Sequence, residues 1–96
     1  MILLFASYLN ANDIFSVQGI VFNKKSQKPI AGANIIIENS ANGSSSDNEG
    51  KFNLEIKNLS KAKLVFTMIG FKDTSVVIDQ TNYDQPIKVF LNPKAI

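Results

Sequence analysis

Apolar and polar residues alternate along most of this chain, which predicts β-strands rather than helices. The clearest case is the segment 51–57, where Phe52, Leu54 and Ile56 are separated by charged or amide side chains. Residues two apart share one face of a strand, so this segment has one face for a core and one for solvent. It is the best-defined half-buried strand in the sequence.

Similar patterns predict further strands on both sides of this one. Ile35 and Ile37, two β-branched residues, share one face of a predicted strand. In another predicted strand, Leu64 and Phe66 face the core. Gly70 marks a bulge or a bend near the end of that strand. The further strands are predicted over 16–23, 34–38, 63–71, 76–78 and 87–91, with a short additional strand around 43–46.

Two turns separate these strands. Pro29 fixes its own backbone and Gly32 allows a positive φ, so the chain turns here and then extends into the strand at 34–38. Asp47 and Gly50 bound a second tight turn, in which the Asp side chain bonds to nearby backbone N–H groups. Six or seven short strands at near-regular spacing, with no amphipathic helical pattern, predict one antiparallel β-sandwich.

Several apolar residues fall on the faces opposite the predicted core. They either form a second sheet face that docks a neighbouring domain or pack beneath loops of the same domain. These residues are Ile20, Phe22, Ile36, Val65 and Phe90. Phe22, Tyr83 and Phe90 are the aromatic residues expected outside the core.

The N-terminal segment is the most apolar part of the chain. Residues 1–9 are too short to span a bilayer as a helix, and the polar residues 10–13 follow them. We expect residues 1–12 to be a signal peptide or its remnant. The alternative is an ordinary first strand or a buried N-terminal segment.

Composition excludes several classes of function. The 96 residues suffice for one domain, and the chain has no Cys and no His, which removes thiolate chemistry, disulfides and the commonest general base and metal ligand. All ten basic residues are Lys, scattered along a chain of net charge +2, so the basic face of a nucleic-acid-binding protein is missing.

The oxygen-bearing side chains also fail to predict a site. If Gly50 is aligned with the glycine of an EF-hand loop, Ile56 falls where a bidentate Glu is required. The carboxylates that a glycosidase would need lie at predicted turns and strand ends and are expected to be solvated. They are Asp13, Asp47, Glu49, Asp73, Asp79 and Asp84. We therefore predict no catalytic, cofactor-binding or metal-ligating residue, and no zinc.

Four segments in series resemble the carboxypeptidase regulatory-like domain. They are 17–21 (Val-Gln-Gly-Ile-Val), 29–35 (Pro-Ile-Ala-Gly-Ala-Asn-Ile), 46–52 (Ser-Asp-Asn-Glu-Gly-Lys-Phe) and 64–71 (Leu-Val-Phe-Thr-Met-Ile-Gly-Phe). The resemblance implies a seven-stranded, transthyretin-like Greek-key sandwich over residues 16–94. The version that ends in Ile-Gly-Phe is most similar to the domain at the N-terminus of outer-membrane TonB-dependent receptors of Bacteroidota.

This resemblance implies a non-catalytic accessory domain in the periplasm, associated with the outer membrane and in contact with the plug and barrel of a receptor or with other envelope proteins. The alternative is a free-standing periplasmic or cell-surface module that binds glycans or peptides. In metallocarboxypeptidases the fold accompanies a zinc catalytic domain, whose centre needs His residues that this chain lacks. A hydrolase of transthyretin-like fold would need His and Arg, which are also absent.

Overall fold

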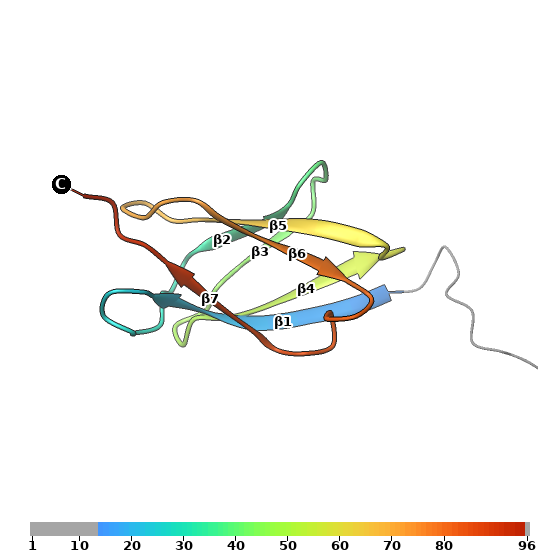
Figure 1. Cartoon of the computed structure of the whole chain (residues 1–96), viewed down its shortest axis with the longest axis horizontal. Helices are drawn as coiled ribbons and strands as arrows, with labels where there is room; N and C mark the ends of the chain where they lie inside the picture. The colour runs from blue at the N-terminus through green and yellow to red at the C-terminus, as the bar shows by residue number, and fades with distance from the viewer. Residues whose placement is uncertain (1–13, 96) are drawn as a thin grey trace, which may run out of the picture.

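The computed structural model describes residues 14–95, and within them every regular element is a strand. The predicted signal segment at residues 1–12 and Asp13 lie outside the described residues. The strands, shown in Figure 1, are β1 (Ile14–Asn23), β2 (Asn34–Ile37), β3 (Gly43–Ser45), β4 (Lys51–Lys57), β5 (Lys61–Thr67), β6 (Thr74–Asp79) and β7 (Ile87–Leu91).

The seven strands form two sheets that pack face to face. One sheet has three strands in the order β4-β1-β7, and the other has four in the order β3-β2-β5-β6. The connections β1–β2, β3–β4, β4–β5 and β6–β7 cross between the sheets, and only β2–β3 and β5–β6 join neighbours in one sheet. The predicted fold class, an all-β sandwich of seven strands, is confirmed.

One strand pair differs from the expected antiparallel arrangement. β1 and β7 run parallel, with Val21 opposite Val89 and Phe22 opposite Phe90. Parallel neighbours cannot be joined by a tight hairpin and need a longer connection. Here β7 arrives from β6 in the opposite sheet, so it is free to enter beside β1 in the same direction. The alternation of side chains within β7 does not distinguish parallel from antiparallel pairing, so the sequence could not predict this orientation.

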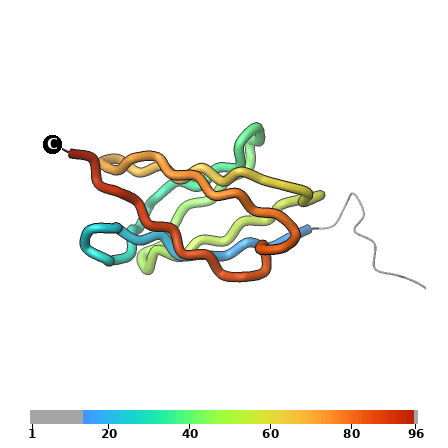
Figure 2. The backbone as a smooth tube through the Cα atoms, viewed as in Figure 1, coloured from blue at the N-terminus to red at the C-terminus, as the bar shows by residue number. Residues whose placement is uncertain are grey.

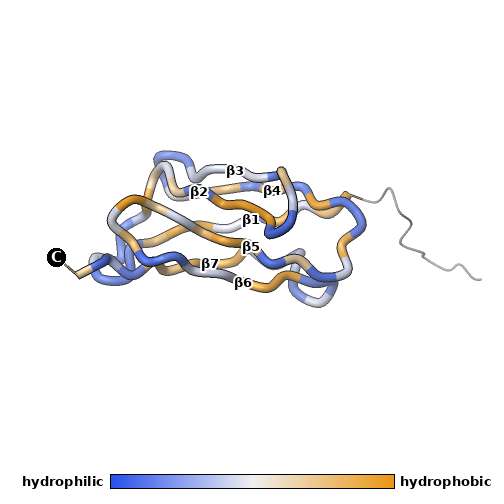
Figure 3. The backbone as a smooth tube through the Cα atoms, turned by 90° about the horizontal axis from the view of Figure 1, so that it is seen from above, coloured by the Kyte–Doolittle hydropathy of each residue, from blue (hydrophilic) through white to orange (hydrophobic). Residues whose placement is uncertain are grey.

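The core lies between the two sheets and uses the alternation seen in the sequence. In β4 the side chains of Phe52, Leu54 and Ile56 are buried while the residues between them are exposed. Phe52 meets Phe66 of β5 across the two layers, with ring centroids 5.3 Å apart and planes at 70°. Edge-to-face aromatic contacts of this kind add stabilisation beyond the area they bury. Figure 3 shows hydrophobic and hydrophilic stretches interspersed along the strands, with hydrophilic residues in the loops that join them.

The ends of five strands differ from those predicted. β2 ends at Ile37 rather than at residue 38, and β6 runs from Thr74 to Asp79 rather than over 76–78. β1 begins at Ile14, two residues earlier than expected, and β3 ends at Ser45 rather than at residue 46. β5 ends at Thr67, so the segment 68–71 is a turn instead of strand. Gly70, with a φ of +89°, does mark a bend, as expected.

Ser46 is the only buried polar residue among those described, and it holds the turn that leads into β2. Its hydroxyl group donates to the Ile30 carbonyl at 2.6 Å and accepts from the Ala33 N–H at 2.9 Å. The backbone of Ser46 also bonds to Gly32 and to Ala33, at 2.9 Å each. Gly32 has a φ of +79°, as the turn prediction requires. A residue that follows β3 thus determines where β2 begins.

The start of β1 and the C-terminal residues lie at opposite ends of the long axis (Figure 2). The C-terminal segment is tied to the turn after β5: the Lys94 N–H donates to the Gly70 carbonyl and the Lys72 N–H to the Asn92 carbonyl, each at 2.8 Å. One end of the sandwich therefore carries the start of β1, and the other carries the C-terminal segment bonded to the turn after β5.

Candidate interaction surfaces

Most of the carboxylates predicted to be solvated lie at exposed positions. Asp47, Asp73 and Asp84 are exposed, and Glu49 forms an exposed ion pair with Lys51 at 3.2 Å. Among residues 14–95, no group of three or more His, Cys, Asp or Glu residues is placed to hold a metal ion. The Asp47 carboxylate serves a turn, in which it accepts from the N–H groups of Glu49 and Lys51 at 2.9 Å each.

Asp79, at the end of β6, has a pKa that its hydrogen bonds to the following turn lower. The Thr81 hydroxyl donates to its Oδ1 at 2.5 Å and the Thr81 N–H donates to the same oxygen at 2.9 Å. These bonds to the charged form, together with the nearby charge of Lys61, lower the pKa of Asp79 from its ordinary value. A catalytic acid needs the opposite shift, so Asp79 is a turn-forming residue rather than a proton donor.

The outer face of the three-stranded sheet carries a pair of stacked aromatic rings. Phe22 of β1 and Phe90 of β7 face each other in register, with ring centroids 5.2 Å apart and planes at 21°. Phe90 is 37% exposed, and Ile20 and Phe22 are half-buried beside it. The structure thus brings together three of the residues predicted to face outward.

Tyr83 does not join this pair: it lies outside the buried core cluster, as expected, but it is not an exposed aromatic residue. It is half-buried and packs against the core, where its ring meets the edge of Phe15 at a centroid distance of 5.0 Å and an interplanar angle of 89°. The loop between β6 and β7 crosses from one sheet to the other and covers the end of the core with this ring. A polar loop sequence gave no sign of that role.

A second, smaller apolar patch lies on the outer face of the four-stranded sheet. Ile36 pairs with Val65 across β2 and β5, and Val77 lies one strand further, opposite Lys63. Ile36 and Val77 are 48% and 46% exposed, and Val65 is half-buried between them. These are three aliphatic side chains surrounded by polar ones, a common feature of sheet surfaces.

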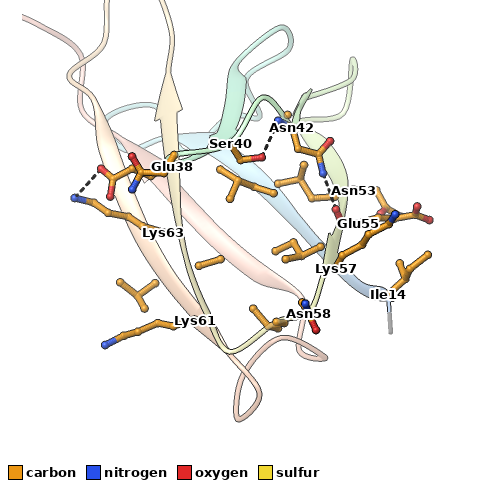
Figure 4. Close-up of a pocket in the computed structure, with 18 residues that line it drawn as sticks. Ile14, Glu38, Ser40, Asn42, Asn53, Glu55, Lys57, Asn58, Lys61 and Lys63 are labelled. Carbon is orange, nitrogen blue, oxygen red and sulfur yellow. Dashed lines mark hydrogen bonds and ion pairs between the residues drawn. The ribbon is translucent and has the colours of Figure 1, made fainter. Parts of the chain in front are cut away.

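A groove of about 900 Å³ opens between the sheets at the end where β4 turns into β5 (Figure 4). Its lining combines core side chains such as Ile37, Leu54 and Ile56 with polar residues of the rim. The rim residues include Glu38, Asn42, Glu55, Lys57, Lys61 and Lys63. Glu38 and Lys63 form an ion pair at 3.6 Å, with both side chains about half exposed.

The groove lies along an open strand edge and contains few carboxylates. β4 is the outermost strand of its sheet, and the Asn42 side-chain amide donates to the Glu55 carbonyl at 2.9 Å on its open edge. Glu38 and Glu55 are the only carboxylates in the lining, and Glu38 is already paired with Lys63.

Ile69 is an exposed residue whose position the sequence pattern did not predict. The pattern placed it in a strand, whereas the structure puts it at the corner of the turn after β5, where 96% of it is exposed. The sequence signal that identifies such a corner is Gly70, because a type II turn needs a residue that tolerates a positive φ at its third position.

Residues 17–96 match the family described as the CarboxypepD_reg-like domain. The chain belongs to this family. The match covers all four segments that suggested the resemblance, and the two-sheet structure agrees with it. The CarboxypepD_reg-like chain is also 32% identical over 92 residues to TonB-dependent receptor P3 of Formosa agariphila.

That alignment covers 95% of this chain but 9% of the relative. The chain therefore corresponds to a small part of that receptor. Within residues 14–95, no helix is long and apolar enough to cross a membrane.

Proposed function

We propose that this CarboxypepD_reg-like domain is a non-catalytic accessory domain of an outer-membrane TonB-dependent receptor, working in the periplasm through protein contacts. The observation that carries the proposal is the 32% identity to a TonB-dependent receptor along nearly the whole of this chain. The family described as regulatory-like gives independent support.

The surfaces of the domain are consistent with this role. Four of its carboxylates take part in turns or ion pairs, and its groove has an apolar floor with a rim of lysine, glutamate and asparagine side chains. Such features offer contact area and hydrogen bonds to another protein. The proposed partners are the plug and barrel of the receptor, and the proposed signal segment at residues 1–12 would direct export.

The gene provides the first test. We expect the reading frame to continue beyond residue 96 into a plug and a β-barrel, and the expressed protein to fractionate with the outer membrane. A reading frame that stops after this domain, with the product in the soluble periplasmic fraction, would contradict the receptor assignment.

A deletion then tests the accessory role. Removal of residues 17–94 from the receptor should leave the barrel folded in the outer membrane, as judged by heat-modifiable migration on gels, while nutrient uptake decreases. Unchanged uptake by the deleted receptor would show that the domain has no accessory function under those conditions.

A free-standing binding module for glycans or peptides is the second candidate. The stacked Phe22 and Phe90 rings favour it, because exposed aromatic faces bind sugar rings and apolar side chains. If this function is correct, the isolated chain binds a ligand in a glycan or peptide screen, and Phe90→Ala abolishes the binding while Ile36→Ala, on the opposite sheet, does not. Absence of any ligand in both screens would leave the aromatic pair as part of the domain's own packing and remove this candidate.

A further inference from the structure

Ile69 is the most exposed large hydrophobic residue in the described chain. Its exposed fraction is 96%, whereas the other exposed hydrophobic residues range from Phe90 at 37% to Ile14 at 57%. An isoleucine this exposed adds nothing to the core of the domain, and any polar residue would serve the fold equally well. Its side chain is thus available to another surface.

The turn holds Ile69 in a fixed position. The Phe71 N–H donates to the Met68 carbonyl at 3.0 Å, and Gly70 has a φ of +89°. Met68 and Phe71, on either side of the corner, pack against the core. Because both flanks are anchored, Ile69 projects from a rigid corner and loses little backbone freedom on binding.

The C-terminal segment runs alongside the same corner. The Lys94 N–H donates to the Gly70 carbonyl at 2.8 Å, and Pro93 forms a β-bridge with Phe71. In a receptor of the kind proposed above, the polypeptide that follows this domain leaves it next to Ile69. The relative, of which this chain matches 9%, contains a large body of further protein.

We propose that Ile69 inserts into an apolar pocket on the part of the receptor that follows this domain, and so sets the orientation of the domain relative to the plug. Lys72 and Lys94 flank the corner, are both exposed, and form no ion pair within residues 14–95, so we expect acidic residues at the rim of that pocket. This inference depends on the proposed receptor function and adds the contact through which it operates.

The test compares thiol accessibility in the isolated chain and in the complete receptor. Ile69→Cys is introduced into each, in a receptor whose native cysteines have been replaced; the 96-residue chain itself has none. Ile36→Cys is the matched control, since Ile36 is also an exposed isoleucine but lies on the outer face of the four-stranded sheet. The rate of modification by a maleimide reagent is measured for each thiol.

We expect the thiol of Ile69→Cys to react about 10-fold more slowly in the receptor than in the isolated chain, because cysteine is a small hydrophobic residue that the same pocket would bury. The thiol of Ile36→Cys should react at similar rates in both.

Three results would overturn the contact. If Ile69→Cys reacts at equal rates in the isolated chain and in a receptor that carries the plug and barrel, the Ile69 contact is wrong but the receptor assignment stands. If the gene encodes no plug and barrel, both the contact and the receptor assignment are wrong. Protection of the Ile69→Cys thiol that appears in the isolated chain and grows with its concentration would assign the corner to contacts between copies and also overturn the proposal.

A second variant gives an independent measurement. In the receptor, Ile69→Asp should accelerate proteolytic cleavage of the segment after residue 95, because the domain is no longer held, while Ile36→Asp leaves the cleavage rate unchanged. Equal cleavage of the two variants would contradict the proposal.

Discussion

The hydroxyl group of Ser46 lies between the Ile30 carbonyl and the Ala33 N–H, at 2.6 and 2.9 Å, and bridges the two backbone groups that a closed turn would join directly. Because Ser46 follows β3 and the turn precedes β2, this bridge connects two segments that are separated by 13 to 16 residues. It fixes the point at which the chain passes from one sheet to the other.

Removal of the Ser46 hydroxyl group should lower the free energy of unfolding more than removal of a serine hydroxyl group usually does. Ser46→Ala leaves a buried carbonyl and a buried N–H without a partner, so we expect a loss of about 2 to 4 kcal/mol in the free energy of unfolding. Ser45→Ala, one residue earlier and exposed, should change it by less than about 0.5 kcal/mol. Urea denaturation measures both, and similar losses in the two variants would contradict the bridge.

Gly32 and Gly50 allow backbone strain to be separated from crowding. Both have a φ of +79°, but a Cβ on Gly32 meets no atom within 4 Å, whereas one on Gly50 lies 2.6 Å from the Val21 carbonyl oxygen. Gly32→Ala should cost about 1 kcal/mol from the left-handed backbone alone. Gly50→Ala should cost about 3 kcal/mol or more, because the clash adds to that strain. Thermal or urea unfolding that ranks the two variants equally would show that the loop before β4 moves aside.

The lowered pKa of Asp79 predicts an acid-dependent effect. Since the folded-state pKa is below its unfolded value, the stability that the carboxylate contributes is present above the unfolded pKa and is lost as the pH falls through the folded one. Thr81→Val removes the first and largest cause of the shift, so the pKa of Asp79 should rise toward its ordinary value. NMR titration of the carboxyl carbon measures it, with Thr74→Val, on the same strand as Asp79, as the control. An unchanged titration in Thr81→Val would assign the shift to another cause.

The Asn42 side chain protects the open edge of β4. Unpaired edge strands promote association between chains, and the Asn42 amide occupies the Glu55 carbonyl on that edge. Asn42→Ala should therefore increase self-association at high protein concentration, as sedimentation velocity would detect. Asn53→Ala, which removes an outer-face side chain bonded to Ser16, is the control. Two variants that stay equally monomeric would show that Asn42 is not needed to block the edge.

The sequence alone determined the strands and most of the core of this domain. Alternation places Phe52, Leu54 and Ile56 on one face of β4 whatever partners that strand has, because side chains of an extended chain point to opposite sides in turn. The positive φ of Gly32 and Gly50 was equally predictable, since a turn needs a residue that tolerates this conformation. Family membership followed from four such local patterns in series.

Only the tertiary structure decided how distant segments meet. The parallel pairing of β1 with β7, the burial of Ser46, the packing of Tyr83 on Phe15 and the exposure of Ile69 all depend on which segments lie side by side across the two sheets. A serine in a polar loop and a tyrosine in another carry no local sign of burial, because burial results from what other parts of the chain place over them. The faces of the strands are therefore encoded locally, while the surfaces offered to a partner are products of the assembled sandwich.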